Sequence, residues 1–246
     1  MAGTAWNYEY VLERALSATQ NPNPTILDYG SGQGQLIALA RSRSVDIYGV
    51  DVPGIEVTDR AALIDANGRI PHPDNAFDVV VSNQVFEHVA NPPVALAEIH
   101  RVLKPGGVFI ALFPDVTVWF EGHIGLYFVH WLRGSPGLLR LYLRVCYALG
   151  LGYYHNGKSA DEWADWAPAT MRDEVCYHSA ADVRRWWTET FGAPAESWEQ
   201  DYMCFRIAVS PRFKALLPLA SQPWMAPMLR FICRVRAGLV LRSYKR

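Results

Sequence analysis

Short apolar runs separated by glycine-rich turns dominate the first half of the chain. Residues 26–27 are apolar and precede three closely spaced glycines, and a second apolar run at residues 47–50 ends in an acid. Between them, the apolar positions of residues 36–40 have the spacing of a helix that begins at about Gln33. The pattern predicts strand, glycine turn, helix and strand, which is half of a nucleotide-binding βαβ unit.

The same periodicities predict further elements up to residue 113. The β-branched run Val79–Val81 is typical of a central parallel strand that is covered on both faces. The segment 92–103 has one apolar helical face, with a proline in its first turn, where no N–H is missed. We expect helices over residues 5–18 and 92–103, and strands over residues 61–64, 79–81 and 108–113.

The pattern becomes aromatic and less regular after the last of these strands. Residues 115–177 are predicted to be an insertion that acts as a lid or binds a substrate, with a helix over residues 138–149 and an acidic, aromatic loop over residues 161–166. A helix beginning at a Ser179 N-cap follows, and we expect closing strands at about 195–200 and 203–209.

The segment 210–246 reads as an extension beyond the sheet. It contains no acid, and Met228, Ile232, Val235 and Leu239 have helical spacing among its many arginines and lysines. A basic amphipathic helix can lie on a membrane surface or bind an anion, or it can dock on its own domain with the basic face in water. Both interpretations stay open, and nucleic acid is disfavoured because no recognised binding motif surrounds the helix.

Composition narrows the class of protein. The chain has 246 residues, 50% of them hydrophobic, and a net charge of −1, which suits one α/β domain over residues 1–246 with a sizeable insertion. Its four cysteines are far apart and match no metal-ligand spacing, so no metal is predicted. With no secretory apolar region after Met1, they indicate free thiols in a reducing cytoplasm.

The glycine turn carries the clearest chemistry. Glycine allows a tight turn and a close approach of backbone to a ligand, and the helix that follows presents free N–H groups. An acid that ends the second strand, here Asp51, can accept hydrogen bonds from both hydroxyls of a ribose. A dinucleotide site would have its third glycine at position 35, where this chain has Gln35, so the spacing disfavours a nicotinamide or flavin enzyme.

At this point the chain resembles the class I S-adenosylmethionine-dependent methyltransferases. The stretch DYGSGQG is similar to their first motif, and three later stretches agree in order and spacing: IDANGRIPHPDNAFDVVVSNQVFEHV, NPPVALAEIHRVLKPGG and VFIALFP. Together they cover Thr25 to Pro114. The resemblance implies a doubly wound, Rossmann-like α/β fold whose seven-stranded sheet is mostly parallel and has helices on both faces. The insertion would follow the fifth strand, and a helical extension would end the chain.

The resemblance also implies the residues that hold S-adenosylmethionine. Asp28 and the glycine turn would hold its methionine end, Asp51 its ribose, and Asp65 and Ala66 its adenine. An alternative is that Asp65 merely caps a turn. The implied cofactor-binding residues are Asp28, Gly30, Gly32, Gly34, Asp51, Val52, Asp65, Ala66, Asn83 and Gln84.

Two histidines are candidates for the group that removes a proton from the methyl acceptor. His88 follows the predicted central strand and should lie near the cofactor or the acceptor. His123 follows the fifth strand together with Asp115 and Glu121, and these three should border the acceptor. The alternative for each histidine is a structural one: His88 would orient its loop with Glu87, and His123 would be a buried, hydrogen-bonded side chain.

The predicted function is methyl transfer to an oxygen of a small or amphipathic acceptor, with a nitrogen or a carbon as the alternative methylated atom. A lipid, a glycan precursor and a secondary metabolite all suit an aromatic insertion and a basic tail, and the tail could touch a membrane peripherally. The alternative is a non-catalytic subunit that binds S-adenosylmethionine or acts as a membrane-associated scaffold, because one fold can host many functions.

Overall fold

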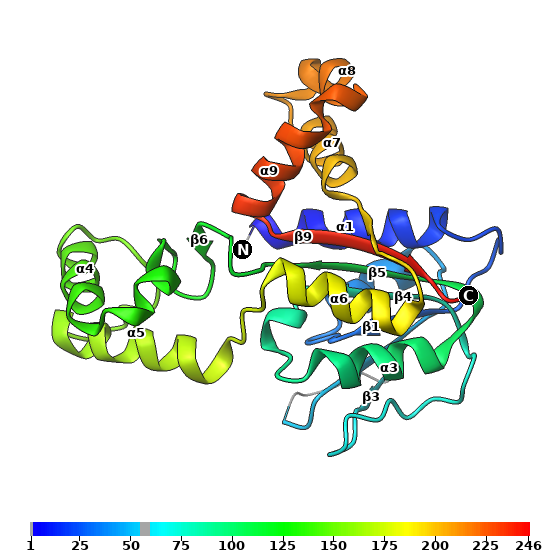
Figure 1. Cartoon of the computed structure of the whole chain (residues 1–246), viewed down its shortest axis with the longest axis horizontal. Coiled ribbons are helices and arrows are strands. Elements are labelled where there is room, and N and C mark those ends of the chain that lie inside the picture. The colour runs from blue at the N-terminus through cyan, green and yellow to red at the C-terminus, as the bar shows by residue number, and fades with distance from the viewer. Residues whose placement is uncertain (1, 55–59) are drawn as a thin grey trace.

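The computed structural model describes residues 2–54 and 60–246, with side chains from Trp6 onward. Its centre is a seven-stranded sheet in the order β3-β2-β1-β4-β5-β9-β8 (Figure 1). The first five of these strands run parallel, whereas β9 is antiparallel to both of its neighbours. The strands are β1 (Ile26–Tyr29), β2 (Ile47–Asp51), β3 (Ala61–Leu63), β4 (Phe77–Asn83), β5 (Leu103–Phe113), β8 (Glu196–Ser197) and β9 (Leu239–Tyr244).

Helices cover both faces of the sheet. The alternation of side chains along β5 explains why: Phe109, Ala111 and Phe113 join the hydrophobic cluster of one face, whereas Val108 and Ile110 join that of the other. α3 (Pro92–Val102) and α6 (Ala180–Phe191) pack on the first face. α1 (Ala2–Ser17), α2 (Gln35–Ser42) and α7 (Glu199–Val209) pack on the second. The predicted fold class is confirmed.

Helix ends follow local chemistry. α6 begins where the Ser179 side chain accepts a hydrogen bond from the Asp182 N–H and ends at Gly192, which is left-handed, as predicted. α2 begins at Gln35, two residues later than expected, because Gly34 precedes it in a left-handed conformation.

The C-terminal prediction is partly wrong. Residues 203–209 belong to helix α7, and the strand that completes the sheet is β9, from the region expected to lie beyond it. Leu239, placed on the basic helix by its spacing, is the first residue of that strand. The helix itself, α9 (Ala226–Arg236), buries Leu229 and packs against α7, with the short helix α8 (Leu217–Ala220) beside them.

The turn into β9 packs tightly on the end of β5. Gly238 has φ +104°, and a Cβ atom there would lie 2.1 Å from the carbonyl oxygen of Phe113. Only glycine fits this close backbone approach, which brings the segment after α9 into the sheet between β5 and β8.

Residues 115–177 form a lobe beside the sheet with its own hydrophobic cluster (Figure 1). α4 (Pro136–Ala148) agrees with the predicted helix, but residues 161–166 are not a loop: they lie in α5 (Ala160–Glu174), which a Ser159–Glu162 capping box begins. No helix joins His123 to His130. The first follows the short strand β6 (Phe120–Glu121), which pairs with β7 (Leu126–Tyr127), and the second is buried in a 3₁₀ turn.

The lobe is held by charges as well as by apolar contacts. Arg140 on α4 forms ion pairs with Asp161 and Asp165 on α5, and Arg144 approaches Asp161. The stripe of arginines predicted on this helix therefore faces its neighbouring helix. Across residues 2–54 and 60–246, every helix is too short or too polar to cross a bilayer.

Candidate active site

A cavity of about 680 Å³ opens at the carboxyl ends of β1, β2 and β4, beside the glycine turn. The strand order switches sides here, because β2 and β3 lie on one side of β1 and β4 and β5 lie on the other. Open α/β sheets bind ligands at such switch points. The lining residues are Tyr29, Gly30, Gly32, Asp51, Val52, Ile64, Asp65, Ala66, Asn67, Gly68, Gln84, Val85, His88, Val89, Ala90, Asn91, Val94 and Ala95.

The glycine turn has two different requirements for glycine. A Cβ atom on Gly30, which has φ +81°, would lie 2.3 Å from a methyl carbon of Val85. Gly32 has φ +52° and open space where a side chain would be, so its backbone is free to meet a ligand. Gly34 lies outside the cavity lining and serves as the N-cap of α2.

Asp51 is fixed at the cavity wall by the backbone. Its Oδ2 atom accepts a hydrogen bond from the N–H of Gly32 at 2.6 Å, and its Oδ1 atom accepts one from the N–H of Val52 at 2.8 Å. Each oxygen keeps lone-pair capacity for one further donor. A pair of neighbouring hydroxyls, as on a ribose, suits this carboxylate.

Two predicted cofactor residues lie behind the cavity wall. Asp28 is 3% exposed, and burial, together with the charge of Asp51, raises its pKa to about 7. Asn83, the last residue of β4, has a buried side-chain oxygen without a hydrogen-bond partner among the described residues. Neither residue is part of the lining, so a direct contact of either with a cofactor stays a prediction.

Asp65 both caps a turn and lines the cavity. Its Oδ1 atom accepts hydrogen bonds from the N–H groups of Asn67 and Arg69, at 2.8 and 2.9 Å. Ala66 follows in the lining, with Ile64 before the turn and Val94 from α3 as apolar neighbours. The turn-capping role is therefore observed, and Asp65 also borders the cavity, while its contact with an adenine ring stays a prediction.

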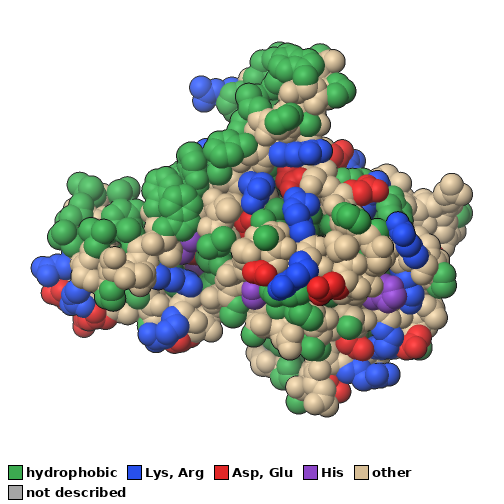
Figure 2. All heavy atoms as spheres, in the orientation of Figure 1, with side chains coloured by type: hydrophobic (Ala, Val, Ile, Leu, Met, Phe, Trp, Pro, Cys, Tyr) green, Lys and Arg blue, Asp and Glu red, His purple; other side chains and the backbone are tan. Residues whose placement is uncertain are grey.

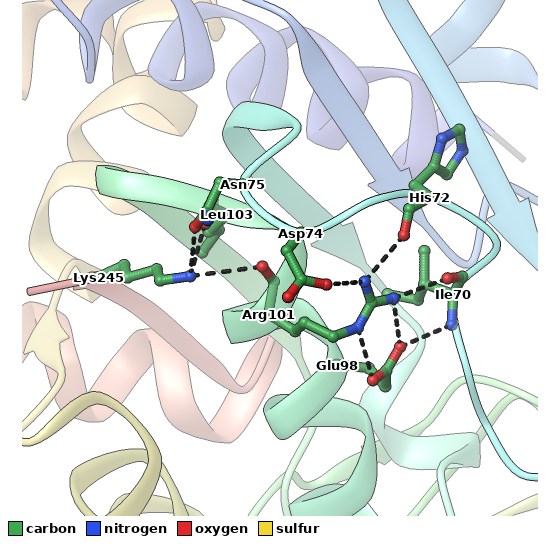
Figure 3. Close-up of polar contacts among 8 residues, drawn as sticks. All are labelled: Ile70, His72, Asp74, Asn75, Glu98, Arg101, Leu103 and Lys245. Atoms are coloured by element: carbon green, nitrogen blue, oxygen red, sulfur yellow. Dashed lines mark hydrogen bonds and ion pairs between the residues drawn. The ribbon is translucent and has the colours of Figure 1, made fainter.

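Arg101, on α3, holds the segment 70–74 that follows this turn (Figure 3). Its guanidinium donates two hydrogen bonds to Glu98, at 2.8 and 2.7 Å, and others to the carbonyl oxygens of Ile70 and His72 and to Asp74. Glu98 in turn accepts from the Ile70 N–H at 2.9 Å. The segment 70–74 is therefore anchored to α3 through Arg101 and Glu98.

The two candidate histidines meet although they are 35 residues apart in sequence. The Nε2 atoms of His88 and His123 are 3.3 Å apart, with the rings edge to face. His88 Nδ1 lies 2.5 Å from the carbonyl oxygen of Glu174, and His123 Nδ1 lies 2.6 Å from a carboxylate oxygen of Glu121. Residues from the sheet and the insertion thus build one cluster.

The hydrogen-bond partners of the two histidine rings favour a protonated pair. A carbonyl and a carboxylate can only accept, so both Nδ1 atoms must donate. Two neutral rings would then bring two bare Nε2 lone pairs together at 3.3 Å. One proton shared between the Nε2 atoms would remove this conflict, and the Glu121 carboxylate beside His123 favours that form.

Two buried carboxyl groups, those of Glu87 and Glu121, lie near the histidine pair and have pKa values shifted in opposite directions. Burial raises the pKa of Glu87 to about 8. Burial would also raise the pKa of Glu121, but hydrogen bonds from His123 and from the Tyr177 hydroxyl hold that pKa at about 2. Burial opposes the charge of His123, yet the Glu121 hydrogen bond and charge outweigh it and raise the pKa of His123. The Glu121 carboxylate therefore favours the protonated form of His123.

A second cavity, of about 230 Å³, lies on the other side of this cluster. Gln84 lines both cavities, while His88 lines the first and His123 the second, so these three side chains form the partition. Gln84 adopts φ +59°, an uncommon conformation for a residue with a side chain, which tends to occur at functional sites. Asp115 does not border either cavity, because it is buried and paired with Arg234 at 3.2 Å.

About half of the residues that line the first cavity, and most of those that line the second, were not predicted from the sequence. Tyr29 and Ile64 adjoin residues that were predicted, and their positions at strand ends could have signalled them. Arg206 and Arg236 line the second cavity from α7 and α9. No local signal marks them, because the fold alone brings these helices to the partition.

The sheet order, the single antiparallel strand and the acid at the end of β2 define a class I S-adenosylmethionine-dependent methyltransferase. A family profile described as methyltransferase domain matches residues 8–193, about three quarters of the sequence. The chain belongs to this family.

Curated relatives match part of the chain. It is 34% identical over 129 residues to an uncharacterized methyltransferase of Mycobacterium avium, covering 47% of this chain and 49% of the relative. It is 33% identical over 148 residues to a demethylmenaquinone methyltransferase of Symbiobacterium thermophilum, covering 53% of this chain and 57% of the relative. The chain spans about half the length of the first relatives that it matches.

Solved structures share the fold at low sequence identity. An S-adenosylmethionine-dependent methyltransferase of Mesorhizobium loti has a TM-score of 0.52 at 12% identity, covering 94% of this chain and 96% of its own. A phosphoethanolamine N-methyltransferase of Haemonchus contortus has a TM-score of 0.52 at 15% identity, covering 97% of this chain and 52% of its own.

The first cavity fits S-adenosylmethionine, the cofactor of the class. Asp51 offers two oriented oxygens for the ribose, and Gly32 leaves open space at the turn. Ile64, Ala66 and Val94 supply an apolar slot of the kind that an adenine ring needs.

Proposed function

We propose that this protein transfers the methyl group of S-adenosylmethionine to an oxygen of a small or amphipathic acceptor held in the second cavity. The observation that carries the proposal is the partition of Gln84, His88 and His123 between a cofactor-sized cavity and a smaller one. A reaction between two bound molecules needs such a shared wall, because their reacting atoms must approach to about 3–3.5 Å.

When bound, S-adenosylmethionine supplies an electrophilic methyl group on a sulfonium, and loss of that methyl leaves neutral S-adenosylhomocysteine. The protein positions the acceptor and removes its proton. The hydroxyl oxygen of the acceptor gains the methyl group, and its proton passes to an Nε2 atom of the histidine pair. Glu121, fixed by Tyr177, then stabilises the histidinium that forms.

This role predicts a definite pH dependence. The pair must first lose its shared proton to act as a base, and the pKa of His123 lies above its ordinary value of 6.5. The rate of transfer should therefore rise as the pH increases through and beyond neutrality. An acceptor carboxylate, which needs no base, would give a rate without this rise.

The test separates binding from transfer. Labelled methyl transfer from S-adenosylmethionine is measured with fractionated lipid and glycan acceptors for His123→Gln and for a control, His155→Gln, in the insertion but outside both cavities. We expect the first variant to lose about 100-fold in rate, within the usual range for a general base. It should keep its calorimetric affinity for S-adenosylhomocysteine, and the control should match wild type.

Unchanged transfer by His123→Gln would refute the base. Binding of S-adenosylhomocysteine with no transfer to any fraction would instead favour the alternative, a non-catalytic subunit.

We also propose a peripheral membrane contact, supported by an uncovered apolar surface. On α4 and its C-cap residue, four side chains are each about half exposed or more and recur along one stripe: Leu138, Leu141, Val145 and Leu149. Figure 2 shows hydrophobic side chains gathered over this lobe and along α9 toward α8. Free cysteines support a reducing compartment, so we propose the cytoplasmic side of the membrane.

Flotation with vesicles tests the contact. Leu141→Ser should weaken binding to phosphatidylcholine vesicles, and Leu63→Ser, which changes an exposed leucine on β3, should not. Equal flotation of both variants and wild type would reject a role for α4.

A further inference from the structure

The second cavity continues into a third, which has an aromatic character. Phe120 and Arg236 line both, and the third has a volume of about 470 Å³ between the insertion and α9. Trp119 and Phe231 contribute rings to it and contact each other edge to face. Together the two cavities have the dimensions of a small-molecule site, which spans about 300–1,000 Å³.

The second and third cavities together are called the acceptor path here, and its middle part, in the second cavity, is cationic. Arg206 and Arg236 line the second cavity, and none of its described lining residues carries a carboxylate. Arg206 donates one hydrogen bond to the Tyr202 hydroxyl at 2.8 Å, and that hydroxyl donates to the Asn7 side chain at 2.7 Å. This fixes the Arg206 head group while leaving its other N–H groups available.

Neither arginine has a carboxylate partner in the parts of the chain that the structure describes. Arg234, two residues before Arg236 on α9, shows the contrast, because it is paired with the buried Asp115. The exposed side chain of Arg236 makes no hydrogen bond or ion pair with any described residue. Two unpaired guanidinium groups at one cavity are the usual arrangement for binding a phosphate or carboxylate.

The path therefore has three chemical zones in a fixed order. Gln84 and His123 lie at the partition with the cofactor cavity, Arg206 and Arg236 lie beyond them, and the aromatic rings lie farthest. A neutral sugar would leave both guanidinium groups without a counter-charge. An anion without an apolar part would leave the aromatic groove exposed to water, at a cost proportional to its apolar area.

We propose that the acceptor is an anionic amphipath. Its reacting hydroxyl lies at His123, its phosphate or carboxylate binds Arg206 and Arg236, and its apolar chain lies over Trp119 and Phe231. The inference rests on the proposed function and narrows its acceptor class.

Calorimetry on the enzyme saturated with S-adenosylhomocysteine tests this assignment. The probes are octyl phosphate, octyl glucoside and inorganic phosphate, and the two octyl compounds are kept below their critical micelle concentrations. Octyl phosphate should bind at least about tenfold more tightly than either other probe, because it alone satisfies both zones. Arg236→Gln should weaken it about tenfold, whereas Arg212→Gln, an exposed arginine outside these cavities, should leave it unchanged.

A second variant separates the zones. Phe231→Ala should weaken octyl phosphate and leave the affinity for inorganic phosphate unchanged. Since the exposed side chain of Arg236 has no polar partner among the described residues, its variant should keep the wild-type melting temperature, so a loss of affinity would not reflect unfolding.

The outcomes are distinguishable. Octyl glucoside binding as tightly as octyl phosphate, or an affinity that does not depend on Arg236, would overturn the acceptor class while leaving methyl transfer intact. Failure of wild type to bind S-adenosylhomocysteine would instead overturn the proposed function.

A parallel arm locates the source of the acceptor. Binding to phosphatidylcholine vesicles that contain phosphatidic acid, lost in Arg236→Gln, would support delivery from a bilayer. Dependence on Arg236 for octyl phosphate alone would support a soluble acceptor.

Discussion

Replacing Arg101 by methionine should destabilise the protein and loosen the cofactor cavity together. Methionine keeps most of the apolar stem but removes all five donors of the guanidinium. Glu98, which is only 16% exposed, would lose both of its hydrogen bonds from Arg101, and the carbonyls of Ile70 and His72 would lose theirs.

The magnitude follows from burial. Removing one partner of a buried ion pair costs about 3–5 kcal/mol, because the other charge is left uncompensated. Arg101 is also only 16% exposed, which supports a value in this range, but water still reaches the pair and favours its lower end. Asp74 adds little, since its side chain is 66% exposed. We therefore expect a loss of about 3 kcal/mol in the free energy of unfolding at neutral pH.

Urea unfolding of wild type, Arg101→Met, Glu98→Gln and the double variant measures this loss and its origin. The two single losses should not add, because either removes the same pair. The hydrogen bonds of Arg101 lower the pKa of Glu98. Their stabilisation should therefore be full above the ordinary glutamate pKa, about 4.3, and disappear as the pH falls through the lowered value.

Two results would refute this reasoning. One is a loss below about 1 kcal/mol for Arg101→Met, the range of an exposed pair. The other is a loss that stays constant down to the acid limit of folding. In the variant, calorimetry should also show weaker S-adenosylhomocysteine binding, because the turn after Asp65 would no longer be anchored.

Three further predictions concern single positions. Gly238→Ala should destabilise the fold by more than Gly150→Ala, where φ is also positive but no atom lies within 4 Å and strain alone costs about 1–2 kcal/mol; equal losses in urea unfolding would contradict the clash with Phe113. Burial raises the pKa of Glu87 from 4.5 to about 8, so stability should decline as pH rises between these values; Glu87→Gln should flatten that decline, and a parallel pH profile would be inconsistent with a protonated carboxyl. Asp51→Asn should weaken S-adenosylhomocysteine binding at least about tenfold by calorimetry, and an unchanged affinity would remove Asp51 from the ribose site.

The first half of the fold was readable from sequence because each element there has a local signal. The glycine turn, the β-branched Val79–Val81 run and the proline at the start of α3 each restrict the backbone strongly. Residues 203–209 misled because an apolar, β-rich composition is shared by strands and buried helices. Tyr202 and Phe205 are buried one helical turn apart, and only the arrival of β9 decides which segment enters the sheet.

The candidate site divides along the same line. Gly32, Asp51 and Asp65 lie at or after the ends of three successive parallel strands, β1, β2 and β3, so chain order alone brings them together. The meeting of His88 with His123 could not be derived, because it depends on where a 3₁₀ turn and a hairpin place two distant rings. The arginines of the second cavity come from helices whose packing has no sequence period linking them.

The position of β9 gives synthesis a particular order. β5 is an interior strand of the sheet, yet its second neighbour, β9, is translated about 130 residues later, after the insertion and after α7 and α9. Until residue 244 has left the ribosome, the N–H and C=O groups along one side of β5 have no strand to pair with. Such an open edge recruits other chains, so the nascent protein depends on chaperones or fast completion to avoid aggregation. A premature stop shortly before β9 would therefore yield an aggregating product, even though every residue of the cofactor cavity would already have been made.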